Sequence, residues 1–248
     1  MASSTLGLIL GSVHDGLPLD VKARSPGKTP YGVPSSPVLW VEFADRRIAC
    51  LARHGERHLI PPHLVNYRAN LWFLQQHGVQ RCIALNTVGT IAADFPPGEL
   101  AVPDQVIDYT WGREHTYSDG SQDEIAHVDF TEPFDAELRG QIAAAALGTG
   151  CSIRSGVCGV TQGPRLESAA EVDRLERDGC TMVGMTAMPE ASLARELDMR
   201  YAVCALGVNH AAGRGPGDSS IHAQLERYTA EGLKRLAAVL ERLVPAIG

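Results

Sequence analysis

Hydrophobic positions along the chain form short apolar runs separated by segments with helical spacing. Runs of apolar and small residues predict buried β-strands, because each run is too short for a helix that packs on a core. We expect these strands at Thr5–Gly11, Arg47–Arg53, Arg81–Thr87, Leu100–Tyr109, Ile153–Thr161, Thr181–Met185 and Met199–Val208.

Helices are expected between the strands. Pro61 and Pro62 end the second strand and start a helix over residues 63–78. Further helices are predicted over Ala136–Ala146, Ala169–Asp178 and Pro189–Leu197, followed by a long terminal helix with candidate N-caps at Asp218, Ser219 and Ser220. The proline-rich residues 18–37 are predicted to be an irregular loop, and the polar residues 110–134 a long excursion.

This alternation of strands and helices predicts a single α/β domain over residues 1–248. The sequence shows no internal repeat, no low-complexity tract and no linker-like change of composition. In α/β folds, ligands bind at the carboxyl ends of the strands. The residues that follow each strand are therefore the candidates for chemistry.

Composition narrows the choice of partners. Of the 248 residues, 44% are hydrophobic and 21% charged, as in ordinary globular proteins. With a formal net charge of -7 and no Lys/Arg cluster, we expect no nucleic-acid partner. The apolar runs are too short to span a bilayer, and the N-terminus lacks the basic region of a signal peptide, so no membrane partner is expected. Six scattered cysteines without a CxxC pair favour a cytoplasmic protein with reduced thiols.

Several short motifs fail on their spacing. Gly27-Lys28-Thr29 lacks the first glycine of a P-loop and is followed by Pro30. His54 and His58 are four residues apart, but Gly55 argues against the helix on which they could share a metal. The sequence has no GxSxG motif and no GxGxxG motif after a strand. We therefore expect no metal site.

One group of strand-end residues suits an oxyanion such as phosphate. Hydroxyls, glycine amides and an Arg/His pair supply convergent donors with compensating charge. The group comprises Ser12, Arg53, His54, the run Asn86-Thr87-Val88-Gly89, and Thr186. Each residue alone also fits a plain role: a turn residue for Ser12, a surface cation for Arg53, a structural histidine for His54 and a helix cap for Thr186.

A second group could read a purine. Glu167 lies in the Gly163–Glu167 segment after one strand, and Asn209 follows the last strand. A carboxylate beside a carboxamide offers acceptors and a donor to a base edge. The alternatives are a surface carboxylate at a helix start for Glu167 and a turn former for Asn209.

Six motifs in register give the sequence a family likeness. They are LARHGERH (51–58), VNYRANLW (65–72), PDQVIDYT (103–110), YSDG (117–120), GPRLES (163–168) and GMTAMPEASLARE (184–196). Over nearly its whole length the chain resembles the trimeric purine nucleoside phosphorylases, and within them the methylthioadenosine phosphorylase branch. The resemblance implies a twisted mixed central β-sheet or barrel flanked by helices, and a homotrimer. It also implies phosphorolysis of a purine nucleoside with inorganic phosphate as co-substrate and no cofactor.

The resemblance also assigns roles to residues. The phosphate site would comprise Ser12, Arg53, His54, Asn86, Thr87 and Thr186, and the purine site Leu166, Glu167, Met185 and Asn209. Pro62 and Ala223 would contact the 5′ group of the nucleoside, and His127 would reach into the site of a neighbouring subunit. Arg53, His54 and Asn209 are the expected catalytic residues.

The sequence departs from the methylthioadenosine branch at the base site. That branch has an aspartate after the last strand, an acid two residues later and a small hydroxyl residue in the GPRLES motif. Here the residues are Asn209, Ala211 and Glu167, as expected for a 6-oxopurine. We therefore expect 5′-methylthioinosine as the substrate, with phosphorolysis of methylthioadenosine or of inosine and guanosine as alternatives.

Two other classes of protein can be told apart from a phosphorylase. A non-catalytic nucleoside-binding protein would keep the base site but would not need the Arg53-His54 pair. A nucleoside hydrolase would need an aspartate cluster for calcium, whereas Asp15 and Asp20 are isolated.

Overall fold

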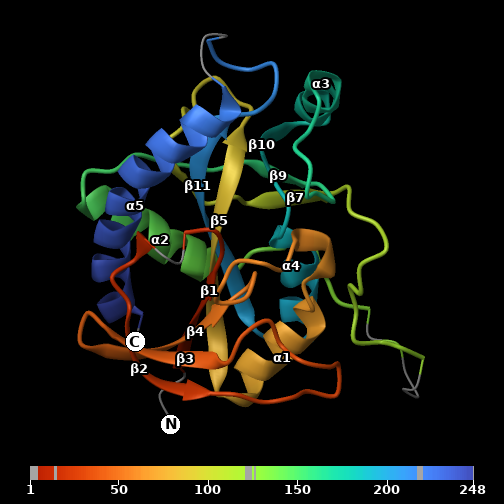
Figure 1. The fold of residues 1–248 in the computed structure, drawn as a ribbon, viewed down its shortest axis with the longest axis vertical. Helices are drawn as coiled ribbons and strands as arrows, with labels where there is room; N and C mark the ends of the chain where they lie inside the picture. Colours follow the sequence, from red (N-terminus) through yellow and green to blue (C-terminus); the bar gives the residue numbers. More distant parts are fainter. Residues whose placement is uncertain (1–4, 14–15, 121–124, 126, 217–219, 248) are drawn as a thin grey trace.

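The computed structural model describes residues 5–13, 16–120, 125, 127–216 and 220–247. Its centre is one mixed β-sheet with helices on both faces (Figure 1). From one edge to the other, the main path of hydrogen-bonded strands is β2 (Asp20–Ser25), β3 (Val38–Phe43), β4 (Arg46–Ala52), β1 (Thr5–Leu10), β5 (Val79–Thr90), β10 (Cys180–Gly184), β9 (Val157–Val160) and β7 (Gln105–Asp108).

The sheet branches at β5. Both β1 and β11 (Arg200–His210) pair with β5 in parallel, and β10 pairs with its last residues in antiparallel fashion. β6 (Leu100–Ala101) adds to β11, and β8 (Ile153–Arg154) adds to β6. The expectation of a single-domain α/β fold with a mixed central sheet is confirmed.

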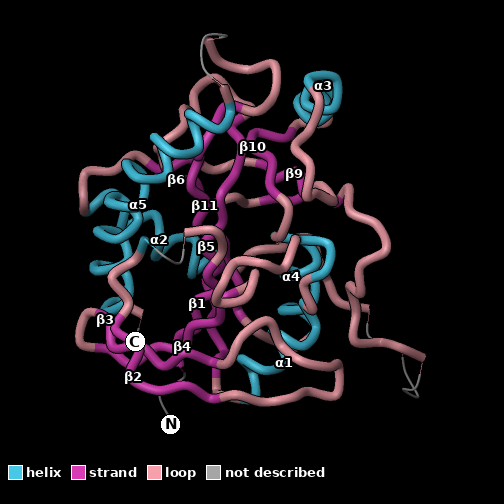
Figure 2. The backbone as a smooth tube through the Cα atoms, in the orientation of Figure 1, coloured by secondary structure: helices cyan, strands magenta, loops and turns pink. Residues whose placement is uncertain are grey.

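The helices bury both faces of this sheet. α2 (Ala136–Gly148) and α5 (Ile221–Ala246) pack on one face, and α1 (Tyr67–Gln76) and α4 (Ala187–Glu196) on the other (Figure 2). α3 (Ala169–Arg177) contacts β10. Side chains on β1 alternate between the two faces: Leu6, Leu8 and Leu10 join the α5 core, whereas Ile9 joins the α1 core.

Polar caps set where the helices begin. Asn66, Asp135, Ser168 and Ser220 each accept a hydrogen bond from the backbone N–H three residues later. α1 consequently begins at Tyr67, and the prolines form a short 3₁₀ turn over Pro62–Leu64 rather than the predicted helix start. Of the candidate caps of α5, Ser220 is the one that caps it, while Asp218 and Ser219 lie outside the described residues.

The predicted irregular loop over residues 18–37 is wrong in part, because it contains the edge strand β2. Every residue of β2 is at least partly exposed, so the strand has no apolar pattern and depends on pairing with β3. β3 was not predicted either. It turns into β4 through Ala44 and Asp45, both of which have positive φ, as tight hairpins require.

Two predicted strands are each broken in the middle. The segment 100–109 divides into β6 and β7 around Pro103, which lacks an N–H donor. The segment 153–161 divides into β8 and β9 around Gly156, with φ of +139°. The breaks coincide, because the backbone N–H of Asp104 donates to the carbonyl of Gly156 over 3.0 Å.

The two central strands are longer than predicted. β5 and β11 pair as far as Thr90 and His210, so Val88, Gly89 and Asn209 lie within strands rather than after them. A bulge shifts the register between Gly207 and Asn209 and places Asn209 opposite Gly89. A bulge changes the direction of the side chains that follow it.

Candidate functional site

A cavity of about 320 Å³ opens where β5, β10 and β11 meet. This volume suits a small-molecule site, for which about 300–1,000 Å³ is typical. Most of the expected site residues share this one cavity: Ser12, Arg53, His54, Pro62, Thr87, Leu166, Glu167, Met185, Thr186 and Asn209 all line it.

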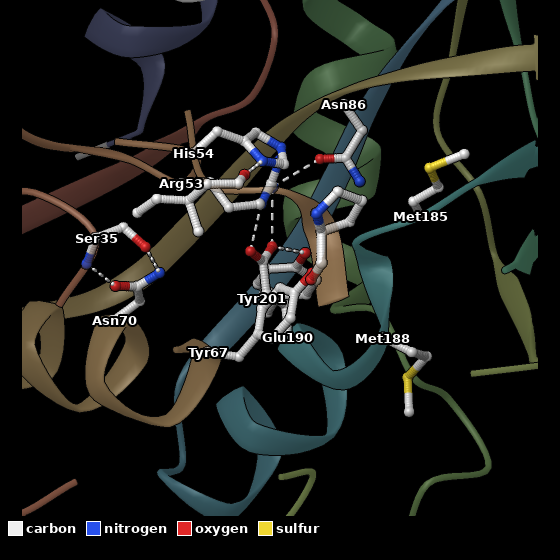
Figure 3. Close-up of polar contacts among 12 residues, drawn as sticks. Ser35, Arg53, His54, Tyr67, Asn70, Asn86, Met185, Met188, Glu190 and Tyr201 are labelled. Carbon is white, nitrogen blue, oxygen red and sulfur yellow. Dashed lines mark hydrogen bonds and ion pairs between the residues drawn. The ribbon is translucent and has the colours of Figure 1, made fainter. Parts of the chain in front are cut away.

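Arg53 is buried and bound by a carboxylate. It is 1% exposed, and its Nε and Nη2 donate to the two carboxylate oxygens of Glu190 on α4 over 2.5 and 2.9 Å. Glu190 is fully buried and also accepts from the hydroxyl of Tyr201 over 2.8 Å (Figure 3). This arrangement excludes the surface-cation role for Arg53.

The pair is electrostatically matched. Burial lowers the pKa of Arg53 and the charge of Glu190 raises it, with the net shift upward. Burial, followed by the charge of Glu190, raises the pKa of Tyr201 well above its usual value. Arg53 is therefore charged and Tyr201 neutral, so the hydroxyl of Tyr201 donates to Glu190.

Asn86 contacts Arg53 and is not one of the residues that line the cavity. Its Oδ1 accepts from Arg53 Nη2 over 2.8 Å (Figure 3). The remaining guanidinium nitrogen, Nη1, lies beside Gly11, where a Cβ atom would be only 2.8 Å from it. Gly11 thus leaves space for Nη1 beside Ser12, a cavity residue.

His54 is fixed by a backbone carbonyl. Its Nδ1 lies 2.8 Å from the oxygen of Ile60. A carbonyl oxygen can only accept, so Nδ1 carries a hydrogen and donates it to Ile60. The His58 ring lies 4.7 Å from that of His54, and its Nε2 is 3.3 Å from Ser12 Oγ.

Thr186 is the N-cap residue of α4 and is 7% exposed. Its hydroxyl makes no capping hydrogen bond within the described part of the chain. The alternative that the Thr186 side chain serves as a cap is therefore wrong, and Thr186 lines the cavity.

Asn209 has hydrogen-bonding capacity at both polar ends of its carboxamide. Its Nδ2 donates to the carbonyl of the next residue, His210, over 2.7 Å, which fixes the orientation of the amide. The amide nitrogen has a second hydrogen, and Oδ1 is an acceptor. Gly89 lies opposite, where a Cβ atom would be 3.4 Å from Nδ2.

Glu167 is held by a neighbour that the sequence did not single out. The hydroxyl of Thr161 donates to Glu167 Oε1 over 2.6 Å. Thr161 is tied to β10 through its backbone N–H, which donates to the carbonyl of Gly184 over 2.9 Å. The carboxylate is thus anchored through one oxygen.

Apolar walls enclose the rest of the cavity. A Cβ atom on Gly163 would be 2.5 Å from the sulfur of Met185 and 3.0 Å from Pro62, so only glycine permits this close packing. Its φ of +60° favours glycine as well. Leu166 remains 42% exposed at the cavity.

The matches to known proteins agree with this geometry. The model of the phosphorylase superfamily matches residues 5–245. The chain belongs to the phosphorylase superfamily.

Individual relatives are named for reactions on purine nucleosides. A probable S-methyl-5′-thioinosine phosphorylase of Pseudomonas syringae is 44% identical, with 92% of this chain and 93% of the relative covered. A 6-oxopurine nucleoside phosphorylase of Pyrococcus furiosus is 38% identical, with 98% and 92% covered. The structure of Schistosoma mansoni methylthioadenosine phosphorylase with adenine superimposes with a TM-score of 0.91 at 29% identity, covering 99% of this chain and 92% of that one.

Two residues with expected substrate contacts do not line the cavity of this phosphorylase. Ala223 is exposed on the first turn of α5, and Ile221 and Leu225 are the α5 residues that line the cavity. His127 is exposed in the excursion between β7 and α2. Their roles stay predictions.

Glu190, Tyr201 and Thr161 were missed by sequence reasoning. A signal existed for Glu190, because a buried arginine needs a carboxylate partner. Among the described residues, no three His, Cys, Asp or Glu side chains gather closely enough to hold a metal ion. None of the described helices is long and apolar enough to cross a membrane.

Proposed function

We propose that this protein cleaves S-methyl-5′-thioinosine with inorganic phosphate, giving hypoxanthine and 5-methylthioribose 1-phosphate. The observation that carries this proposal is the joint presence of Asn209 and Glu167 in one cavity with Arg53 and His54. The relatives named for S-methyl-5′-thioinosine and for 6-oxopurine nucleosides support the same base preference.

Phosphate would bind on the Arg53 side of the cavity. Phosphate attacks C1′ of the ribose as the purine leaves, so it is both the nucleophile and the counter-charge of a sugar that becomes cationic. Arg53, through Nη1, and His54 would hold the phosphate, and hydroxyls of Ser12, Thr87 and Thr186 would orient it. Asn86 and Glu190 would keep the guanidinium in place.

The purine, which is the leaving group, would bind on the side of the cavity that holds Asn209 and Glu167. Asn209 Oδ1 can accept from N7–H as the purine is released, while the second hydrogen of Nδ2 can donate to O6. The second carboxylate oxygen of Glu167 can accept from N1–H of hypoxanthine. Adenine presents an amino group and a bare N1 instead, and each polar mismatch buried in this way costs about 1–3 kcal/mol.

The 5′ side of the cavity has apolar walls. Pro62, Ile221 and Leu225 offer no hydrogen-bonding side chain to a 5′-hydroxyl group. A methylthio group would bury apolar surface there, which is favourable by about 25 cal/mol for each Å². This chemistry favours the methylthio nucleoside over inosine.

We further propose a cytoplasmic homotrimer that needs no metal or organic cofactor. In this assembly His127 of one subunit would approach the ribose and 5′ group bound by its neighbour. Trp111, Ile125 and Leu166 are exposed apolar side chains on the excursion and the cavity rim, and a neighbouring subunit would cover them.

A substrate panel with and without phosphate tests the function. Release of free base is measured from methylthioinosine, methylthioadenosine, inosine, guanosine and adenosine. We expect phosphate-dependent release, with the highest kcat/KM for methylthioinosine. Equal release without phosphate would exclude a phosphorylase, and a preference for inosine would assign the chain to the ordinary 6-oxopurine reaction.

A further inference from the structure

Arg113 lies in the segment between β7 and α2, yellow-green in Figure 1, and sequence reasoning gave this residue no role. β7 and β9 are parallel neighbours with Asp108 opposite Val160, so the segments that follow these two strands leave the sheet side by side. Arg113 follows five residues later, against the loop that leaves β9.

The guanidinium of Arg113 binds three segments that adjoin the cavity. Its Nη2 donates to the carbonyls of Gln162 and Thr161 over 2.8 and 3.3 Å, and its Nε to the side chain of Gln162 over 3.1 Å. These contacts hold the loop after β9. That loop continues to Glu167, whose carboxylate accepts from the hydroxyl of Thr161.

Nη1 holds the other two segments. It donates to the carbonyls of Met185 and Met188 over 2.7 and 2.8 Å, on either side of Thr186. Nη1 also lies 3.2 Å from the hydroxyl of Tyr67, which in turn donates to the carbonyl of Pro62 over 2.8 Å. Tyr67 begins α1, Met188 lies on α4 and Met185 in the connection between β10 and α4; Figure 3 shows the two methionines to one side of Arg53 and Glu190.

This use of an arginine is unusual. Five N–H groups serve six acceptors, so every hydrogen of the guanidinium is engaged. Within the described ranges, no carboxylate lies at ion-pair distance from Arg113, and all but two of its acceptors are backbone carbonyls. The guanidinium therefore bonds mainly backbone carbonyls of loops and, among the described residues, does not bond a carboxylate.

We propose that Arg113 is a positioning residue that holds the base-reading loop, the Met185–Met188 connection and the Pro62 wall in register. It thereby sets the discrimination between 6-oxopurines and 6-aminopurines. The proposal rests on the proposed function and deepens it. Arg113 acts through Thr161 on Glu167, and through the two methionine carbonyls on Thr186. Displacement of reacting groups by about 1 Å can cost on the order of 10²-fold in rate.

The test compares Arg113→Met and Arg113→Lys with Glu114→Gln. Glu114 is the next residue of the same segment, and its exposed carboxylate pairs with Arg68 over 3.1 Å. For each variant, kcat/KM is measured for methylthioinosine and methylthioadenosine, and binding of hypoxanthine and adenine is measured by calorimetry. Thermal unfolding checks that each variant is folded.

For Arg113→Met we expect kcat/KM for methylthioinosine to fall on the order of 10²-fold. The ratio of the two substrates should narrow at least tenfold, and hypoxanthine should lose its advantage over adenine in binding. Arg113→Lys should give kcat/KM values and ratios between those of the unmodified protein and Arg113→Met, since an ammonium group cannot bond all three segments at once. Glu114→Gln should match the unmodified protein. A purely structural role would lower the unfolding temperature without changing these ratios.

The proposal is overturned if Arg113→Met, or Arg113→Lys should the first not fold, keeps both the substrate ratio and the binding ratio of the unmodified protein. Failure of the proposed function looks different. In that case the unmodified protein would release no base with phosphate. The ratio of hypoxanthine to adenine binding in the Arg113 variants would still test the role of Arg113.

Discussion

At the scale of single residues, the proposed recognition of the base depends on the carboxamide of Asn209. Its Nδ2 is committed by one hydrogen to the carbonyl of His210, so its direction is fixed before any substrate binds. An aspartate at this position would place a carboxylate oxygen against that same carbonyl, where two acceptors repel. The carboxamide is therefore matched both to the protein and to a 6-oxopurine.

Asn209→Asp should weaken methylthioinosine cleavage about 5- to 150-fold, which corresponds to about 1–3 kcal/mol for the lost polar match. Some methylthioadenosine cleavage should appear, and the double change with Glu167→Ser should raise it further by removing the misplaced carboxylate. The measurement is kcat/KM for both nucleosides, with the exposed amide-to-acid change Gln76→Glu as a control. An unchanged ratio would show that Asn209 does not read the base.

At the scale of elements, α5 both lines and supports the site. Ile221 and Leu225 face the cavity, and between them Gln224, which is 8% exposed, accepts from the backbone N–H of His210 over 3.0 Å. The helix is thus bonded to the residue that orients Asn209. This hydrogen bond connects the proposed packing of the 5′ group against α5 with the proposed contact of the base with Asn209 on β11.

Gln224→Leu should lower the melting temperature and reduce kcat/KM for the nucleoside, because it leaves a buried N–H without its acceptor at a cost of about 1–3 kcal/mol. Gln224→Glu keeps an acceptor at the same place and should lose less of both. The KM for phosphate should stay nearly constant in the two variants, since Arg53 follows β4 whereas the bonded His210 ends β11. Equal losses in Leu and Glu variants would show that the hydrogen bond to His210 is unimportant.

At the scale of the whole molecule, the proposed trimer divides each site between two subunits. Trp111 is 73% exposed on the excursion that also carries His127, which is consistent with a covered surface. Such a division makes activity depend on assembly. It also allows two defective subunits to complete one another.

We expect Arg53→Ala and His127→Ala homotrimers to be weakly active and a mixed preparation, unfolded and refolded together, to regain activity. In a mixed trimer, a subunit with intact Arg53 can meet a neighbour with intact His127. Sedimentation of the unmodified protein should give a trimer, and refolding each variant alone is the control. Activity no greater than the sum of the two separate variants, or an active monomer, would contradict the shared site.

The sequence by itself determined the alternation of strands and helices, the α/β class and most of the site. Apolar runs and caps such as Ser220 act locally, so their pattern can be recognised along the chain. Arg53, Thr186 and Asn209 could be found because strand ends gather ligand residues and because six motifs stand in a known order.

Only the tertiary structure decided the partners that act across the chain. Glu190 meets Arg53 from 137 residues away, and Arg113 reaches Met185 over 72. The edge strand β2 exists through pairing with β3, and the bulge before Asn209 comes from the register of β11 on β5. Such contacts depend on how distant segments pack, and no local pattern of hydrophobic and polar residues encodes them.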